Sequence, residues 1–222
     1  MKKYRRHKDY KRYSRPIPGE RVQIDVTKIT AGCYQYTAID DCTRLKVLRI
    51  FSKKNADSSI NFLNEIIDSF GDIGFAVQRI QSDNGKEFYN YKFQYELLEH
   101  RIKFRPIPPA SPHLNGKVER GQKTDKEEFY RTLNLKDSKL DLTFKLKEWE
   151  HFYNYSRPHS SLKGKTPYEK YLEVKDKVPH QFDVFDEFTN SDEQIKDYEL
   201  EKLKRRNPEI AKLLAAKMSH MS

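Results

Sequence analysis

Cysteine is scarce in this sequence of 222 residues, in which Cys33 and Cys42 are the only two. They do not form a Cys-x-x-Cys pair, and both lie in a stretch whose residues favour β-strands. A zinc site needs clustered ligands and a disulfide framework needs more cysteines, so the sequence indicates neither. We therefore interpret both cysteines as small core residues.

Long apolar runs are missing as well. No run approaches the roughly 18 residues that a membrane-spanning helix needs, and the N-terminus lacks the apolar segment of a signal peptide. The sequence also contains no internal repeat. These absences lead us to expect a cytoplasmic protein without a membrane partner.

Positive charge, in contrast, is abundant. The formal net charge is +10, and residues 1–15 hold eight basic side chains against Asp9 as the single acid. Most of the excess charge therefore lies in one N-terminal arm. Such clustering favours a polyanion as the partner, although a solvated, disordered tail would have the same composition.

The rest of the chain has the size and composition of one main domain with appendages. Hydrophobic residues make up 36% and charged residues 34%, which is polar for a globular protein but leaves enough Phe and Tyr for a core. Pro16 and Pro18 indicate an extended connector, so the domain should begin near Gly19.

Strand-like segments come first in this domain. Residues 21–28, 35–39 and 46–51 are rich in Val, Ile, Tyr and Thr and are separated by short turn signals, which predicts an antiparallel meander. Apolar residues then recur at helical spacing from Ile60 to Phe70. The predicted order after this helix is a strand at 75–81, a helix at 88–99 and a strand at 102–104. Antiparallel strands followed by alternating helices and strands predict a mixed α/β sheet.

The second half of the chain is predicted to be helical. Residues 117–133 should form a helix although they carry few large apolar side chains and Gly121 interrupts them. Something other than packing selected their composition. Apolar residues from Leu142 to Tyr153 at i, i+4, i+7 and i+11 predict a helix that docks on the core, followed by a short helix from Thr166. Residues 192–217 favour a charged helix.

Three acidic residues occupy informative positions. Asp25 interrupts an otherwise apolar strand, and a buried carboxylate needs a cation or hydrogen-bond donors beside it. Asp83 follows an apolar strand and precedes an Asn-Gly turn, which places it at a strand's carboxyl end, where open α/β sheets bind ligands. Glu119 begins the polar helix. Carboxylate oxygens gathered at one site would suit Mg²⁺ or Mn²⁺.

The local sequences around these acids resemble those of integrase-core transposases, the retroviral-integrase superfamily. Asp83 and Glu119 have 35 residues between them, and Asp25 precedes them in the first strand, as in the DDE triad of that family. The motifs that carry the resemblance are Gln81-Ser-Asp-Asn-Gly-Lys-Glu-Phe, Ser111-Pro-His-Leu-Asn-Gly-Lys-Val-Glu-Arg and Asn154-Tyr-Ser-Arg-Pro-His-Ser-Ser-Leu. The last of these is similar to the segment that follows the core in bacterial insertion-sequence transposases. The resemblance extends from about Arg15 to Val174.

This resemblance implies a ribonuclease-H-like α/β fold, a five-stranded mixed sheet with helices on both faces, followed by C-terminal helices. It divides the chain into a basic arm (1–17), a catalytic core (18–135), C-terminal helices and loop of the core (136–175) and a charged, helical tail (176–222). It also implies two Mg²⁺ or Mn²⁺ ions, with Asp25 bridging both, Asp83 ligating one and Glu119 the other.

The implied activity is metal-dependent phosphoryl transfer, in which element ends are nicked and joined to target DNA. A homodimer or higher multimer would act on DNA, in the cytoplasm and at the nucleoid. One alternative is a nuclease of the same fold that only hydrolyses. Another is an inactive DNA-binding remnant, because only about 17 residues precede the core, too few for the helix-turn-helix module of bacterial members.

Side chains near the third acid and in the downstream motif are candidates for DNA contacts. On a continuous helix, Lys123 and Lys126 would share a face with Glu119 and could bind phosphates. The alternative is that these lysines pair with acidic side chains on a solvated face, and that the downstream residues hold a buried loop. The candidates are Asn115, Lys117, Arg120, Lys123, Lys126, Arg157 and His159.

Overall fold

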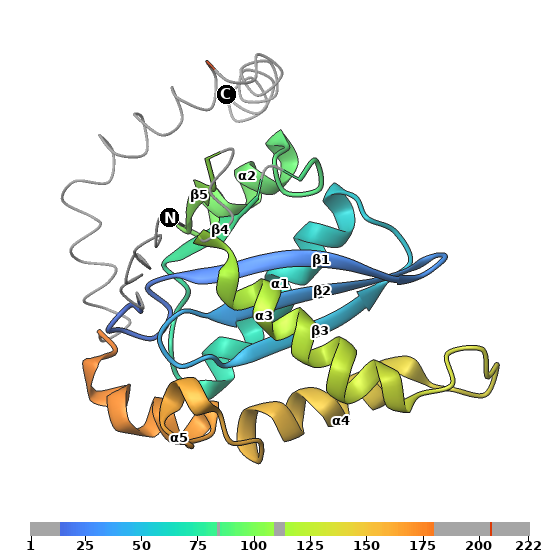
Figure 1. The fold of residues 1–222 in the computed structure, drawn as a ribbon. Helices are drawn as coiled ribbons and strands as arrows, with labels where there is room; N and C mark the ends of the chain where they lie inside the picture. The colour runs from blue at the N-terminus through green and yellow to red at the C-terminus, as the bar shows by residue number, and fades with distance from the viewer. Residues whose placement is uncertain (1–13, 84, 109–113, 180–204, 206–222) are drawn as a thin grey trace, which may run out of the picture.

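The computed structural model describes residues 14–83, 85–108, 114–179 and 205. These residues form a five-stranded sheet with the strand order β3-β2-β1-β4-β5 (Figure 1). The strands are β1 (Val22–Thr30), β2 (Cys33–Asp40), β3 (Lys46–Phe51), β4 (Arg79–Ser82) and β5 (Lys103–Pro106).

The sheet is mixed, as predicted. β1 pairs antiparallel with β2, and β2 pairs antiparallel with β3, so the first three strands form the expected meander. β4 adds parallel to β1, and β5 adds parallel to β4. The connection from β3 to β4 therefore crosses the sheet, and it places the end of β4 beside β1.

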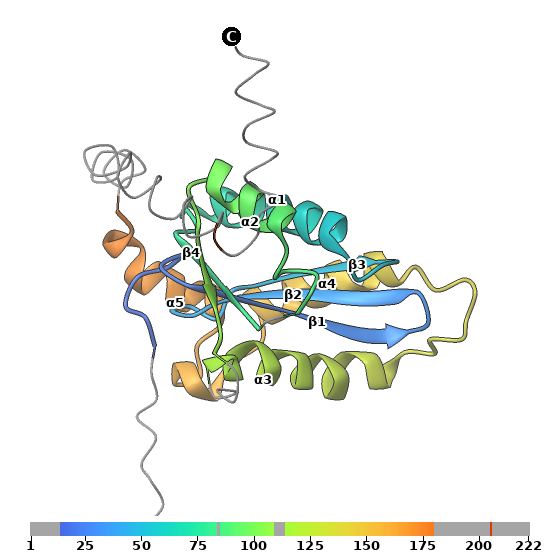
Figure 2. The same cartoon turned by 90° about the horizontal axis from the view of Figure 1, so that it is seen from above.

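Helices cover both faces of the sheet (Figure 2). α1 (Ala56–Ile73) and α2 (Tyr91–Glu99) lie on one face, and α3 (Gly116–Thr124) lies on the other. α4 (Leu142–Tyr155) packs on β3, and α5 (Pro167–Val174) packs on α4. The predicted layers are thus confirmed.

Side chains that alternate along the strands divide the interior into two clusters. On one face of the sheet, Val22 and Ile24 of β1 pack with Phe62 and Phe70 of α1. On the other face, a smaller cluster joins β3, the segment after α3, and α4. Its buried members are Leu48, Phe129, Tyr130, Leu146, Trp149 and Tyr153.

The ends of α1 tie distant parts of the chain together. Asn55 caps its start, where the side-chain oxygen accepts a hydrogen bond of 3.0 Å from the backbone N–H of Ser58. The helix ends at Gly74, which has φ 113° and so takes the left-handed conformation that glycine tolerates. A Cβ at Gly74 would lie 2.7 Å from the hydroxyl of Tyr171. Helix α5 therefore packs against this turn and belongs to the same domain.

Three predicted boundaries were wrong. β4 begins at Arg79 rather than at 75. Residues 75–78 alternate in burial but do not adopt strand conformation. α2 begins at Tyr91 rather than at 88, since the side chain of Asn90 caps it. β5 begins and ends later than the predicted 102–104.

The helix predicted over 117–133 is not regular. α3 ends at Thr124, and a π-helix (Asp125–Phe129) and a 3₁₀ turn (Tyr130–Thr132) follow. The irregularity begins at Asp125, whose buried carboxylate is held by groups from other elements. The predicted helix at 192–217 falls outside the described residues, Arg205 excepted. None of the helices in the described part is both long and apolar enough to span a bilayer.

Candidate active site

Strand pairing brings the first two acids to the same level of the sheet. The parallel register pairs Gln23 of β1 with Gln81 of β4. Asp25 and Asp83 follow these two residues by two positions each. Asp25 is half-buried on β1, whereas Asp83 is exposed just beyond β4. The Asp83 carboxylate accepts a hydrogen bond of 3.0 Å from the backbone N–H of Gly85, which defines the turn after the strand.

The third acid reaches this level because α3 begins directly over β1. The side-chain oxygen of Gln23 accepts hydrogen bonds from the backbone N–H groups of Lys117, at 3.2 Å, and Val118, at 3.3 Å. Side chains on a strand alternate between faces, so Asp25 lies on this same face. Glu119 follows Val118 and is exposed. The face of the sheet that carries α3 therefore carries the acids of both β1 and α3.

Gly121 allows α3 to approach the sheet closely. A Cβ at this position would lie 2.3 Å from Cδ1 of Ile39, a contact that no side chain tolerates. The sequence suggested that Gly121 interrupts the helix, but α3 continues through it. Its role is packing, and it keeps the helix that carries Glu119 close to β2.

The charges of the other two acids act on Asp25. The pKa of Asp25 is raised to about 6, chiefly by burial, and the negative charges of Asp83 and Glu119 contribute to this rise. The backbone N–H of Val26, 2.7 Å from its carboxylate, and the positive charge of Lys54 act in the opposite direction. Among the described residues, no three acidic, His or Cys side chains are grouped tightly enough to hold a metal ion as they stand.

A lysine and a fourth acid border the three acids, and the sequence analysis missed both. Nζ of Lys54 lies 2.9 Å from a carboxylate oxygen of Glu87, whose side chain is only 5% exposed. Desolvation acts to lower the pKa of Lys54, but the hydrogen bond to Glu87 and the charges of Glu87, Asp83 and Asp25 raise it. Glu87 could have been found, because it lies in the motif after Asp83. Lys54 stands before α1 and has no local signal.

A buried polar network holds the end of α3, and it too was missed. The carboxylate of Asp125 accepts hydrogen bonds from Lys46 Nζ at 2.6 Å, Trp149 Nε1 at 2.7 Å and Gln35 Nε2 at 2.9 Å. Lys46 lies over the ring of Tyr153, 3.5 Å from its centroid. These groups come from β2, β3 and α4, so the network fixes the segment after α3 to three other elements.

The predicted DNA contacts on α3 and next to its two ends fall into two groups. Lys117 forms an ion pair with the buried Asp41, and desolvation, followed by the charge of Arg44, lowers its pKa to about 8. Asn115 is buried, and its side-chain oxygen accepts no hydrogen bond from the described residues. By contrast, exposed side chains that could reach a ligand are Arg120, Lys123 and Lys126. Nζ of Lys123 lies 3.8 Å from a carboxylate oxygen of Glu127. This is the pairing with an acidic side chain that was given above as the alternative to DNA contact.

The two candidates in the downstream motif have partners within the protein. Nε and Nη2 of Arg157 donate hydrogen bonds to the two carboxylate oxygens of Glu128. His159 is 7% exposed, its Nε2 lies 3.4 Å from the carbonyl oxygen of Tyr153, and burial, with the charge of Arg157, lowers its pKa to about 4. Burial of His159 agrees with the structural alternative, and contact of either residue with DNA stays a prediction.

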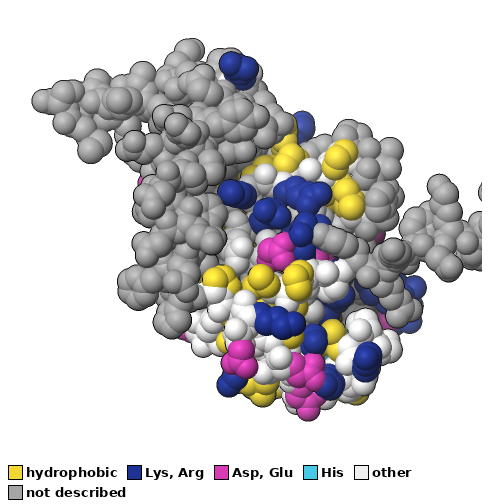
Figure 3. Space-filling model, turned by 90° about the vertical axis from the view of Figure 1, so that its left-hand side faces the viewer, with side chains coloured by type: hydrophobic (Ala, Val, Ile, Leu, Met, Phe, Trp, Pro, Cys, Tyr) yellow, Lys and Arg dark blue, Asp and Glu magenta, His cyan; other side chains and the backbone are white. Residues whose placement is uncertain are grey.

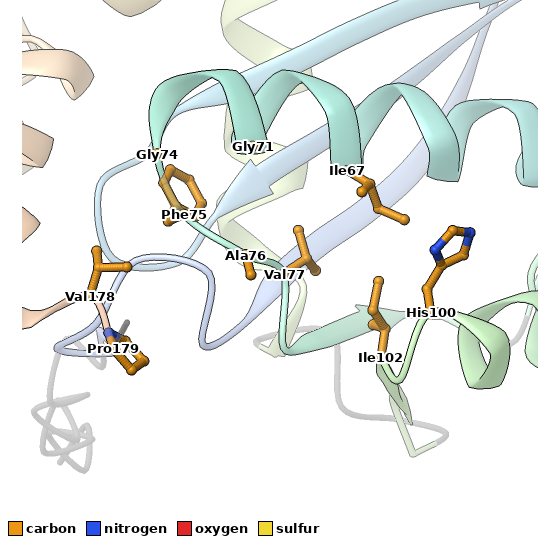
Figure 4. A pocket seen from close by; sticks show the side chains of 10 residues that line it. All are labelled: Ile67, Gly71, Gly74, Phe75, Ala76, Val77, His100, Ile102, Val178 and Pro179. Carbon is orange, nitrogen blue, oxygen red and sulfur yellow. The ribbon is translucent and has the colours of Figure 1, made fainter. Parts of the chain in front are cut away.

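An apolar pocket of about 340 Å³ lies away from the acids (Figure 4). It is located between the end of α1 and the start of β5, and it is lined by Ile67, Phe75, Val77, Ile102 and Val178 among others. None of the three acids lines it.

Comparison with known families agrees with this geometry. Two family models, each described as an integrase core domain, match residues 15–112 and 100–167, so together they extend from before β1 to the start of α5. The chain belongs to the integrase-core superfamily. Its three acids lie within the matched residues.

A viral relative supports this membership. The chain is 32% identical over 152 residues to the proposed integrase ORF3 of Spiroplasma virus SpV1-C74; the match covers 61% of this chain and 41% of that protein. This integrase-core chain thus spans less than half the length of its relative.

The fold is that of integrase catalytic cores, which are ribonuclease-H-like. The catalytic core domain of BIV integrase matches with a TM-score of 0.57 and 20% identity, over 72% of this chain and 97% of that one. The HTLV-2 integrase catalytic core domain in complex with magnesium matches with a TM-score of 0.57 and 20% identity, over 69% and 96%. A chain of the simian T-cell lymphotropic virus intasome, in complex with PP2A regulatory subunit B56 gamma, matches with a TM-score of 0.63 and 18% identity, over 71% and 55%.

Proposed function

We propose that this integrase-core protein is a DDE transposase that nicks the ends of a mobile element and joins the freed 3′-hydroxyl to target DNA. The observation that carries the proposal is the arrangement of three elements of an integrase core: the register of β1 and β4 brings Asp25 and Asp83 to the same level, and Gln23 of β1 anchors the start of α3, which carries Glu119. DNA is the partner in this proposal, both as element ends and as target. A homodimer or higher multimer would hold the two DNA segments together.

The donor set suits a hard divalent cation. All three groups are carboxylates, and the burial and like charges that disfavour ionised Asp25 would be offset by a cation among them. Mg²⁺ or Mn²⁺ held by Asp25, Asp83 and Glu119 would supply activation of the attacking hydroxyl and stabilisation of the leaving oxygen.

The chain itself positions these ligands on three separate elements. Asp25 is fixed on the central strand, and its carboxylate is oriented by the backbone N–H of Val26. Asp83 is oriented by the turn at Gly85. Glu119 is placed by the two hydrogen bonds between Gln23 and the start of α3. Asp25 and Glu119 thus lie on anchored elements, which hold side chains more precisely than a loop would, and the hydrogen bond from Gly85 restrains Asp83.

Strand joining on pre-cut ends, supplied in trans, tests this proposal. Glu119→Gln keeps the size and hydrogen-bonding capacity of the side chain but removes its charge, so we expect joining with Mg²⁺ to fall at least about 100-fold, as for loss of a group that acts in the transition state. DNA binding without metal should be unchanged or stronger, because one negative charge facing phosphate has gone.

Glu148→Gln is the matched control, since Glu148 is half-exposed on α4 and forms an ion pair with Lys145 of the same helix. It should join DNA at the parental rate. If Glu119→Gln also joined at the parental rate, Glu119 would have no part in the mechanism. A parent that binds DNA without joining it would support the remnant, and a parent that only cuts DNA would support the hydrolytic nuclease.

A further inference from the structure

The α3 face of the sheet continues beyond the acids as a row of basic side chains. The parallel register of β4 and β5 pairs Arg79 with Lys103 and Gln81 with Arg105. Gln81 points toward α3, because its Nε2 donates to the carbonyl oxygen of Leu114 just before that helix. Paired residues point to the same side of a sheet, and so do alternate residues of one strand. Arg79, Lys103 and Arg105 therefore lie on the α3 face, and we refer to them as the basic row.

The opposite face of these two strands confirms this orientation. Ile80 is fully buried in the main core, and its partner Phe104 packs against the same core beside α2. The residues before and after Ile80 and Phe104 in their strands must therefore point to the opposite face. Asp83 follows Gln81 by two residues, just beyond the end of β4, so the basic row leads along these strands toward the acids.

The basic row is accessible. Helix α3 packs on β1 and β2 and so covers the part of this face that carries Gln23. Over β4 and β5, Arg105 is exposed and Arg79 and Lys103 are half-buried. A row of cations on neighbouring strands spans about 5 Å per strand, which is a suitable spacing for contact with a phosphate backbone.

Two acidic side chains in this region, Glu20 and Asp41, are paired with arginines. Glu20 forms an ion pair of 2.7 Å with Arg15, and Asp41 forms one of 2.6 Å with Arg21. Desolvation lowers the pKa of Arg79, and the positive charges of Arg15, Arg105 and Arg21 lower it further. The charge of Glu20 acts in the opposite direction. Positive charge therefore accumulates here. Figure 3 shows lysine and arginine side chains gathered around an acidic one on the side of the molecule at the left of Figure 1.

We propose that the basic row binds the sugar-phosphate backbone of the DNA whose reacting phosphate lies at Asp25, Asp83 and Glu119. This inference rests on the proposed function and assigns it a second contact surface. Three carboxylates repel a phosphate backbone, and positive side chains beside them offset part of this repulsion, in addition to any cation that the carboxylates hold. The two arginines suit this task, because a guanidinium binds phosphate through two parallel hydrogen bonds.

The salt dependence of DNA affinity in the absence of metal tests this assignment. Each phosphate contact that is lost lowers the slope of log affinity against log salt by about 1. We expect the double variant Arg79→Gln with Arg105→Gln to lower the slope by about 2 and Arg105→Gln alone by about 1. Since Arg105 is exposed, the single variant keeps the test valid if the double variant folds poorly.

Two further variants make the result specific. Lys136→Gln with Lys139→Gln removes the same charge from exposed positions before α4 and should leave the slope unchanged. Arg105→Lys keeps the charge and should restore most of the slope. An unchanged slope in the Arg105→Gln and double variants would overturn the proposal, as would an equal loss in the Lys136 and Lys139 control.

The binding measurement is independent of the joining reaction. A parent that fails to join DNA but loses slope on Arg105→Gln would contradict the proposed activity and still support the basic row. A parent that joins DNA, together with an Arg105→Gln variant whose slope is unchanged, would support the proposed activity and contradict the basic row. A competition experiment distinguishes DNA from a protein partner, with an acidic polypeptide added at matched charge concentration and at the salt concentration where DNA is released. If the polypeptide displaced DNA from the parent but not from the double variant, the basic row would be a protein-binding surface. The proposal would then be wrong.

Discussion

Lys46 and Asp125 form an ion pair that is buried on both sides. Nζ of Lys46 lies 2.6 Å from a carboxylate oxygen of Asp125, and the two side chains are 0% and 1% exposed. Burial lowers the pKa of Lys46, and the charge of Asp125 acts against that decrease. The pair joins β3 to the point where α3 changes into a π-helix, six residues after Glu119.

Asp125→Asn should therefore destabilise the protein strongly. Removing one partner of a buried ion pair leaves the other charge without compensation, which costs about 3 to 5 kcal/mol. Adding Lys46→Met should restore much of that loss, because the uncompensated charge is then gone. The free energy of unfolding from denaturant titrations measures both effects. A loss as small as that expected for the exposed Glu148→Gln, about 0.5 kcal/mol or less, would contradict the role given to this pair.

His159 should make the stability of the protein depend on pH. Burial lowers its pKa in the folded state to about 4, below its ordinary value of 6.5. The unfolded chain therefore binds the proton more readily between these two values, and stability is complete above about pH 6.5 and is lost as the pH falls toward 4. We expect the parent to lose roughly 1 to 2 kcal/mol more than His159→Gln between pH 7 and pH 4.5.

The matched control for that measurement is His151→Gln, on the exposed side of α4. This variant should lose stability with falling pH as the parent does. Equal losses in the parent and in His159→Gln would show that His159 does not carry the pH dependence.

Lys54 should weaken the binding of divalent metal. Its ammonium acts electrostatically on both Asp25 and Asp83, and a positive charge there opposes a second cation. Lys54→Gln should therefore tighten the binding of Mn²⁺ by roughly five-fold, which corresponds to about 1 kcal/mol of repulsion removed. Calorimetric titration of the metal in the absence of DNA measures this change. The neighbouring Lys53, which is also exposed, provides the control Lys53→Gln; an equal gain in that variant would show a general charge effect.

The features that sequence predicted are the ones encoded locally. The strand periods, the helix stripes and the motifs around Asp83 and Glu119 each occupy a short window, so they indicated the sheet, its layers and the candidate acids. Residues 75–78 were misjudged because an apolar composition favours a strand, whereas strand conformation also requires a neighbour with which to pair.

The features that sequence missed depend on contacts between distant segments. Lys46 and Asp125 are 79 residues apart, and nothing near either residue indicates the other. The basic row depends on the register between β4 and β5, since a shift of one residue would turn Arg105 into the core. Gly121 seemed to weaken a helix, because its contact with Ile39 exists only once α3 lies on the sheet.

The packing of Tyr171 against the end of α1 also bears on where this fold can be divided. Helices α4 and α5 come after all three acids in the chain, yet one completes the smaller cluster over β3 and the other reaches the main core through Tyr171. A gene break just after the third acid would leave both clusters incomplete. The segment that follows the acids therefore belongs to the same folding unit, and a fragment that ended just after Glu119 should not fold on its own.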